Sequence, residues 1–182
     1  MKIGVFLNYV GLGSNLLHLS YCHEIAKKYG PITIITLCEN LKMALEDDPL
    51  IENVIFIEGK KYRRLLDIIE LSRKLKVNSF NKLYIFYPSI RTYLAAKLAN
   101  IKEVYSYSFL KKKKLHLVHA AKEFTERYLK INNCPTETNL FIKEHKKEIA
   151  KKSINQNIFN MIIGAGSSGP TTKWGEKNYI NL

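Results

Sequence analysis

The 182-residue sequence has few cysteines, few arginines and no long apolar run, and each shortage excludes a class of protein. Three cysteines without a Cys-x-x-Cys pair suggest neither a disulfide framework nor a zinc site, which favours a reducing compartment. The apolar runs are far shorter than the roughly 20 residues that span a bilayer. The N-terminal run stops at Asn8 and lacks the pattern of a signal peptide. We therefore expect a cytoplasmic protein.

Charge is plentiful but has mostly one sign. Lys and Arg number 29 against 16 Asp and Glu, a formal net charge of +13, and only five of the cations are arginines. Lysine suits diffuse attraction more than bidentate recognition. Solvated faces explain the excess, and so does attraction to an anionic membrane, a phosphorylated substrate or nucleic acid. Because no nucleic-acid-binding motif accompanies the charge, we expect no specific nucleic-acid partner.

Short apolar runs alternate with segments of helical spacing. The pattern predicts strands over 3–7, 32–37, 54–57, 83–87 and 103–107, and helices over 15–29, 39–46, 62–75, 90–100 and 115–129. Such alternation indicates right-handed βαβ units, and hence an α/β, Rossmann-like, mostly parallel sheet with flanking helices. In the helix over 62–75 we expect Ile69 to face inward. In the helix over 90–100 we expect Leu94, Ala95 and Leu98 to share one face.

The chain changes character after a polar break around Pro135. We expect a first domain over 1–138 and a charged linker or exposed helix over 139–156. Residues 157–182 then predict a strand, a glycine loop and the beginning of a helix, which cannot bury a core of their own. They either add to the first domain or, as we expect, begin a second domain.

Two glycine-rich segments, at 11–13 and 164–169, each lie between a strand and a helix in the predicted order. Glycine lets a backbone approach a phosphate closely, and free helix N–H groups favour an anion. The second loop adds serines, threonines and Lys173, a set that suits a diphosphate. Its spacing is neither that of a P-loop nor the full dinucleotide fingerprint. An ordinary strand-to-helix turn explains both loops as well.

Four stretches, in order, carry a resemblance to a known family. They are GVFLNYVGLGSNLLHLSYCHEIAKKYG, DDPLIENVIFI, LYIFYPSIRTYLAAKLANIKEVYSY and GAGSSGPTTKWGEKNYINL. The sequence resembles glycosyltransferase family 9, the ADP-heptose:lipopolysaccharide heptosyltransferase-like proteins of GT-B architecture. The resemblance implies the N-terminal half of a GT-B fold and transfer of a heptose-like sugar. The donor would be a nucleotide-sugar such as ADP-heptose, and the acceptor a lipopolysaccharide-type glycolipid or other glycan, with no further cofactor and no metal.

The resemblance also assigns site residues. Donor phosphates would lie at Gly166, Ser167, Ser168, Thr171, Thr172 and Lys173, although Lys173 stands one place later than the family's usual lysine. Acceptor-side residues are predicted at the first loop and after the third and fourth strands: Gly13, Asn15, Lys60, Arg63, Tyr87, Ser89 and Arg91. For the residues after the two strands, a solvated helix face and a strand-end tyrosine are the alternatives.

The predicted catalytic position departs from the family pattern. The family places an acidic general base directly after Gly-Leu-Gly, where this sequence has Ser14, which does not accept a proton at neutral pH. His18 follows one helical turn later and is the candidate substitute; a packed or solvated histidine is the alternative. A second hypothesis is therefore a non-catalytic module that binds an anionic glycolipid or phosphorylated ligand. The lysine run 111–114 predicts peripheral contact with the anionic inner-membrane surface.

Overall fold

The computed structural model describes residues 1–58, 65–108, 116–154 and 158–160. The chain divides into two compact units, Met1–Phe141 and Ile142–Leu182. The domain boundaries expected from the sequence stay a prediction.

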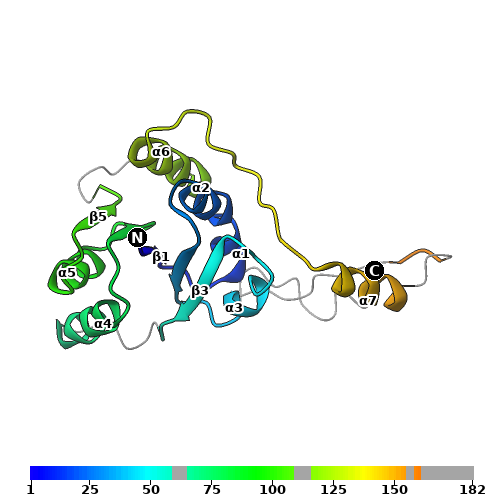
Figure 1. Cartoon of the computed structure of the whole chain (residues 1–182), viewed down its shortest axis with the longest axis horizontal. Helices are drawn as coiled ribbons and strands as arrows, with labels where there is room; N and C mark the ends of the chain where they lie inside the picture. The colour runs from blue at the N-terminus through cyan, green and yellow to red at the C-terminus, as the bar shows by residue number, and fades with distance from the viewer. Residues whose placement is uncertain (59–64, 109–115, 155–157, 161–182) are drawn as a thin grey trace, which may run out of the picture. The chain divides into compact units, whose positions relative to one another are not determined.

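A parallel sheet organises the first unit (Figure 1). Its strands are β1 (Ile3–Leu7), β2 (Ile32–Thr36), β3 (Ile51–Phe56), β4 (Lys82–Ile85) and β5 (Glu103–Ser106). They lie in the order β3-β2-β1-β4-β5, and every neighbouring pair is parallel. The α/β, Rossmann-like fold predicted from the alternating pattern is confirmed.

The central strands are apolar because both of their faces are covered. Every residue of β1 and β2 is buried, as expected for the middle of a parallel sheet. Gly4 permits close packing on β1, since a Cβ atom there would lie 2.8 Å from Leu83 Cδ1. At the edge, β3 begins three residues before the predicted strand. Its first residues, Glu52 and Asn53 among them, are partly or fully exposed and so lack the apolar signal.

Helices cover the two faces of the sheet. They are α1 (Leu12–Leu16), α2 (Leu19–Tyr29), α3 (Leu41–Ala44), α4 (Leu65–Val77), α5 (Ile90–Leu98) and α6 (Leu117–Leu129). In Figure 1, α2 lies beside α6, and α4 lies beside α5. The helix pairs therefore form two layers, one on each face of the sheet.

The two layers differ in composition. The aromatic layer, under α2 and α6, is centred on the buried rings of Tyr21, Tyr84, Phe86 and Phe124. The aliphatic layer, under α4 and α5, is built mainly from aliphatic and small side chains: Ile35, Ile57, Ile68, Leu71, Leu75, Leu83, Ile85, Ala95, Ala96, Ala99 and Ile101, with Phe6 and Phe80.

The prediction for α5 is wrong in orientation. Leu94 and Leu98 are 45% and 59% exposed, whereas Ala95 is fully buried. The inward face instead carries Thr92, Ala95 and Ala96. Small side chains allow a helix to lie close to a sheet, and the large ones then point away from it. Ile69 on α4, also expected to face inward, is 47% exposed.

The predicted helix over 15–29 is two helices, because a side chain takes over one backbone hydrogen bond. In a continuous helix the His18 N–H would donate to the Ser14 carbonyl. Here the His18 ring Nδ1 occupies that carbonyl at 2.7 Å, and the His18 N–H donates to the Asn15 carbonyl at 3.0 Å. The helix therefore ends at Leu16 and begins again at Leu19.

In the second unit, the described helix is α7 (Glu144–Ser153), and no residue of it is buried. This agrees with the expectation of an exposed charged helix in the segment. Within the described residues of the whole chain, no helix is both long enough and apolar enough to cross a membrane.

Candidate functional site

A cleft opens where the carboxyl ends of the parallel strands meet, the edge at which open α/β sheets bind ligands. Its volume is about 440 Å³, within the usual range for small-molecule sites. Asn8 follows β1, Leu37 follows β2 and Tyr87 follows β4, and the N-terminal parts of α4 and α5 complete the walls. The lining residues are Phe6, Asn8, Leu37, Asp67, Ile68, Leu71, Tyr87, Ser89, Arg91 and Thr92.

The structure brings three predicted acceptor residues together in this cleft. Tyr87, Ser89 and Arg91 all line it. Ser89 begins α5 as its N-cap, and its Oγ accepts hydrogen bonds from Thr92 N at 3.2 Å and Thr92 Oγ1 at 2.9 Å. This cap fixes the first turn of α5, which carries Arg91. A guanidinium offers a planar fork of donors suited to phosphate, carboxylate or hydroxyl oxygens.

Two further polar residues line the same cleft and were missed from the sequence. Asn8 directly follows the buried run of β1, and Asp67 lies in the first turn of α4. Asn8 could have been predicted from its position, because a polar residue just after a parallel strand lies at the ligand-binding edge. Arg91 and Asp67 give the cleft one cation and one carboxylate. Such a mixed set suits a ligand rich in hydroxyl groups.

In the first loop, the Asn15 side chain holds the fold together. Its Nδ2 donates to the carbonyls of Tyr9 at 2.9 Å and Gly11 at 2.7 Å, and its Oδ1 accepts from Thr36 Oγ1 at 2.7 Å. The residue is 1% exposed. The amide therefore ties the loop to β2. Gly13 is exposed in α1, and its contact with an acceptor stays a prediction.

The two predicted catalytic residues contact each other through the backbone. His18 is fully buried, and its Nδ1 lies 2.7 Å from the Ser14 carbonyl oxygen. A carbonyl only accepts, so this contact assigns the proton to Nδ1 and leaves a lone pair on Nε2. Among the described residues, His18 Nε2 has no hydrogen-bond partner. Burial lowers the pKa of His18, which favours the neutral ring.

Tyr9 contacts both this histidine and Tyr87, one of the residues that line the cleft. Its ring stacks on His18 at 4.7 Å between centroids and meets Tyr87 edge-on at 5.9 Å. The Tyr9 hydroxyl donates to the Phe86 carbonyl at 3.0 Å. Burial, with a smaller effect of Tyr87, raises the pKa of Tyr9 to about 12. His18 therefore has a free lone pair but is covered by a neutral tyrosine.

A second cavity of about 430 Å³ lies beyond β5, against α6. Tyr107 and Phe124 from the aromatic layer line it together with charged residues of α6, including Glu123 and Arg127. Among the described residues, the buried Tyr107 hydroxyl has no partner, and burial raises its pKa. The sequence did not predict this cavity.

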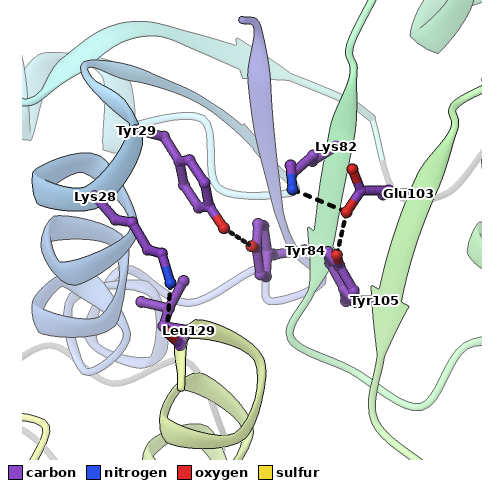
Figure 2. Close-up of polar contacts among 7 residues, drawn as sticks. All are labelled: Lys28, Tyr29, Lys82, Tyr84, Glu103, Tyr105 and Leu129. Carbon is purple, nitrogen blue, oxygen red and sulfur yellow. Dashed lines mark hydrogen bonds and ion pairs between the residues drawn. The ribbon is translucent and has the colours of Figure 1, made fainter. Parts of the chain in front are cut away.

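At the opposite edge of the sheet, polar contacts join the strands and helices (Figure 2). Lys82 Nζ lies 2.8 Å from Glu103 Oε2, and the Tyr105 hydroxyl donates to the same carboxylate. Tyr84 donates to the Tyr29 hydroxyl at 3.2 Å. Lys82 and Glu103 are the first residues of β4 and β5. This network pairs the beginnings of two strands and lies away from the cleft.

The remaining predicted site residues lie outside the described residues. They are the acceptor-side cations Lys60 and Arg63, the lysine run 111–114, and the donor-side set Gly166, Ser167, Ser168, Thr171, Thr172 and Lys173. In the part of the chain that is described, no group of three or more His, Cys, Asp or Glu residues is placed to hold a metal ion.

No family model and no curated protein matches the sequence, but solved structures match the fold. A glycosyltransferase family 9 structure from Veillonella parvula matches 99% of this chain and 58% of its own length, at 17% identity and a TM-score of 0.69. The E. coli ADP-heptose LPS heptosyltransferase II matches 86% of this chain and 52% of its own, at 17% identity and 0.57. The E. coli heptosyltransferase WaaC with ADP matches 75% of this chain and 50% of its own length, at 12% identity and a TM-score of 0.55.

The chain thus spans about half the length of the solved structures that it matches. At these identities the likeness concerns the fold. The resemblance found in the sequence is confirmed at that level: this chain has the α/β, Rossmann-like fold of glycosyltransferase family 9 structures.

Proposed function

We propose that this chain is the acceptor-binding half of a nucleotide-sugar-dependent glycosyltransferase, and that the cleft at the carboxyl edge of the sheet binds the acceptor saccharide. The observation that carries the proposal is the convergence of Tyr87, Ser89 and Arg91 with Asn8 and Asp67 on one cleft. Tyr87, Ser89 and Arg91 are predicted from their positions after β4, and Asn8 and Asp67 join them in the structure at the same edge of the sheet. The glycosyltransferase folds of the matching structures support it.

The donor is proposed to be a nucleotide-sugar such as ADP-heptose. The solved WaaC structures contain ADP and ADP-2-deoxy-2-fluoro heptose, which supports this class of donor. Its phosphates would be bound by the glycine loop at 164–169 and by Thr171, Thr172 and Lys173. The acceptor is proposed to be a lipid-linked saccharide of the lipopolysaccharide type at a cytoplasmic membrane surface.

The reaction would be a displacement at the anomeric carbon. An acceptor hydroxyl forms the new C–O bond, the bond from that carbon to the diphosphate breaks, and the nucleoside diphosphate leaves with the electron pair. The hydroxyl proton passes to a base. His18 offers a lone pair on Nε2 but is covered by Tyr9, so its use requires Tyr9 to move. Asp67 is a carboxylate already in the cleft.

A second candidate function is binding without catalysis. Ser14 in place of an acid, together with the burial of His18, favours a module that recognises a glycolipid or phosphorylated saccharide. Loss of a positioned general base typically costs about 10²–10⁴ in rate. Binding by the cleft would survive that loss.

The cleft is tested by calorimetric titration of the 182-residue chain with a deacylated lipopolysaccharide core oligosaccharide. We expect saturable binding that Arg91→Ala weakens at least tenfold, since a charge-assisted hydrogen bond is worth about 1.5–3 kcal/mol. Arg127→Ala, at the other cavity, is the matched control and should bind normally. Equal affinities of the two variants would contradict the assignment of the cleft.

Catalysis is tested separately by release of ADP from ADP-heptose in the presence of a lipid-linked acceptor. Turnover by this chain would overturn the binding-module alternative. With turnover in hand, His18→Gln and Asp67→Asn distinguish the two candidate bases, and the variant that loses the rate without losing oligosaccharide affinity identifies the base. Saccharide binding without turnover would favour the module.

A further inference from the structure

Helix α5 exposes an unusual face. Ile90, Leu94 and Leu98 are 58%, 45% and 59% exposed. Successive helical residues turn by about 100°, so these three side chains fall within about 80° of arc and form one stripe along the helix. Large apolar side chains that share an exposed stripe are informative, whereas isolated ones are common on protein surfaces.

The stripe is a consequence of how α5 packs. Thr92, Ala95 and Ala96 face the sheet and are buried, so the small side chains point in and the large ones point out. Packing within the first unit alone would favour the reverse arrangement, because buried leucine side chains stabilise a core far more than alanine. In Figure 1, α5 lies on the outside of this unit, with α4 beside it.

Cations border the stripe on both sides. On the same helical wheel Arg91 lies just beyond Leu98, and Lys97 lies just before Ile90. The sequence from Ile90 to Lys102 contains Arg91, Lys97 and Lys102 and no acidic residue. Lys97 Nζ lies 5.6 Å from the centre of the Tyr93 ring, close to the apolar surface. An apolar stripe edged by cations is the pattern of a helix that lies in a lipid headgroup region.

Two acidic side chains on elements that contact α5 have cations of their own. Glu70 on α4 pairs with Lys74 at 3.3 Å, and Glu103 on β5 pairs with Lys82 at 2.8 Å. Asp67 lines the cleft with Arg91. The charge next to the stripe is therefore positive, as an anionic lipid surface requires.

We infer that α5 is the membrane contact of this protein, with Ile90, Leu94 and Leu98 inserted among the headgroups of an anionic phospholipid surface. Continuity with the cleft supports the assignment. Ser89 and Arg91 line the cleft and flank Ile90, so the stripe begins at the cleft wall. A lipid-linked acceptor could then keep its acyl chains in the bilayer while its saccharide reaches the cleft. In this respect the inference rests on the proposed function.

The test is sedimentation of the 182-residue chain with vesicles of phosphatidylcholine alone or of phosphatidylcholine with phosphatidylglycerol. We expect binding to the anionic vesicles only. The double variant Leu94→Ser/Leu98→Ser should bind about tenfold more weakly, because two partly inserted side chains are lost. Lys97→Gln/Lys102→Gln should lower the affinity about fivefold for each cation removed.

Matched controls separate α5 from the general positive charge of the chain. Leu17→Ser/Met43→Ser removes two other exposed apolar side chains, and Lys42→Gln/Lys130→Gln removes the same charge elsewhere; all four positions are exposed. Both controls should bind like the unaltered chain. Equal weakening in the controls, or no binding by the unaltered chain, would overturn the inference.

Two further measurements distinguish an unfolded variant and a failure of the proposed function from a loss of membrane contact. Thermal melting of each variant identifies any that is unfolded, and the single variant Leu94→Ser then replaces the double one. Titration with the deacylated oligosaccharide tests the cleft without a membrane, so loss of vesicle binding with normal oligosaccharide binding separates the membrane contact from the proposed function. If sedimentation equilibrium shows a dimer that the double leucine variant dissociates, the stripe is a contact between copies and the membrane assignment is wrong.

Discussion

The two layers on either side of the sheet are built on different principles. The aromatic layer contacts ring to ring: Phe124 alone lies within 4.9–6.4 Å, between ring centroids, of Phe86, Tyr128, Tyr107 and Tyr84. The aliphatic layer keeps its helix α5 close to the sheet with alanines. Polar atoms are buried in or beside the aromatic layer, whereas helix α5, which covers the aliphatic layer, exposes large apolar side chains to solvent.

The two sides also differ in which groups they bury and which they expose. Buried polar groups such as His18 Nε2 and the Tyr107 hydroxyl occur in or beside the aromatic layer. Exposed aliphatic side chains of α5 occur on the other side. Buried polar atoms without a described partner and exposed apolar helix residues thus lie on opposite faces of the sheet, and the cleft opens on the face covered by α4 and α5.

The largest expected effect is loss of the central ring of the aromatic layer. Phe124→Ala removes a side chain that is 6% exposed, and we expect the free energy of unfolding to fall by about 4 kcal/mol. Urea denaturation measures it. The control Phe159→Ala, at an 87% exposed position, should change stability very little. A small effect of Phe124→Ala would mean that the layer does not support the fold.

Overpacking the aliphatic layer should have the next largest effect. Ala96 is fully buried where α5 meets the sheet, so Ala96→Leu must push the helix outward. We expect a loss of about 2 kcal/mol. Lys97→Leu places the same side chain at the exposed neighbouring position and serves as the control. If both variants melt alike, α5 is not held close to the sheet.

A smaller effect depends on pH. Burial lowers the pKa of His18 in the folded state, so below the unfolded pKa of about 6.5 the unfolded chain binds more protons. Stability should therefore fall as the pH drops from about 8 to about 5. Tyr9 and Tyr21, which pack against His18, have pKa values raised to about 12 by burial and stay neutral in this range.

Denaturation of His18→Leu across the same pH range tests this assignment. The variant should lose a part of the acid destabilisation that the unaltered chain shows. His119→Leu, at an exposed position on α6, is the control and should keep the full pH dependence. If the free energy of unfolding of His18→Leu depends on pH as in the unaltered chain, the buried ring does not contribute to the acid destabilisation.

The smallest expected effect is on the exposed stripe of α5. Leu94→Ala should leave the free energy of unfolding within about 0.5 kcal/mol of the unaltered chain, because the side chain is 45% exposed. Thermal melting checks this. A large loss would show that Leu94 contributes to the folded core, and the contrast between the two layers would weaken.

The sequence predicted the elements well because buried strands and helix stops are local signals. The run Ile32–Thr36 is β-branched throughout and forms the buried strand β2, and Ser89 caps α5. The cleft could be anticipated at Tyr87, Ser89 and Arg91 for a similar reason. In a parallel sheet, residues that follow a strand lie at the binding edge.

The misses involve contacts that no local pattern specifies. Asp48 Oδ2 accepts a buried hydrogen bond from His23 Nε2 at 2.7 Å across 25 positions of the chain. The break at His18 depends on a ring that competes with a backbone N–H. Which face of α5 packs on the sheet depends on how close the helix lies to the sheet. Apolar periodicity in the sequence does not distinguish a helix face that packs from one that stays exposed.

The three cysteines have one further consequence. Cys22, Cys38 and Cys134 are all buried, and all belong to the aromatic layer. Burial raises the pKa of the Cys22 thiol, and raises that of Cys134 to about 11, so few thiolates are available to a reagent. The rate of thiol labelling will therefore report how often the side of the sheet covered by α2 and α6 opens. The three cysteines make this measurement possible for one of the two faces of the sheet.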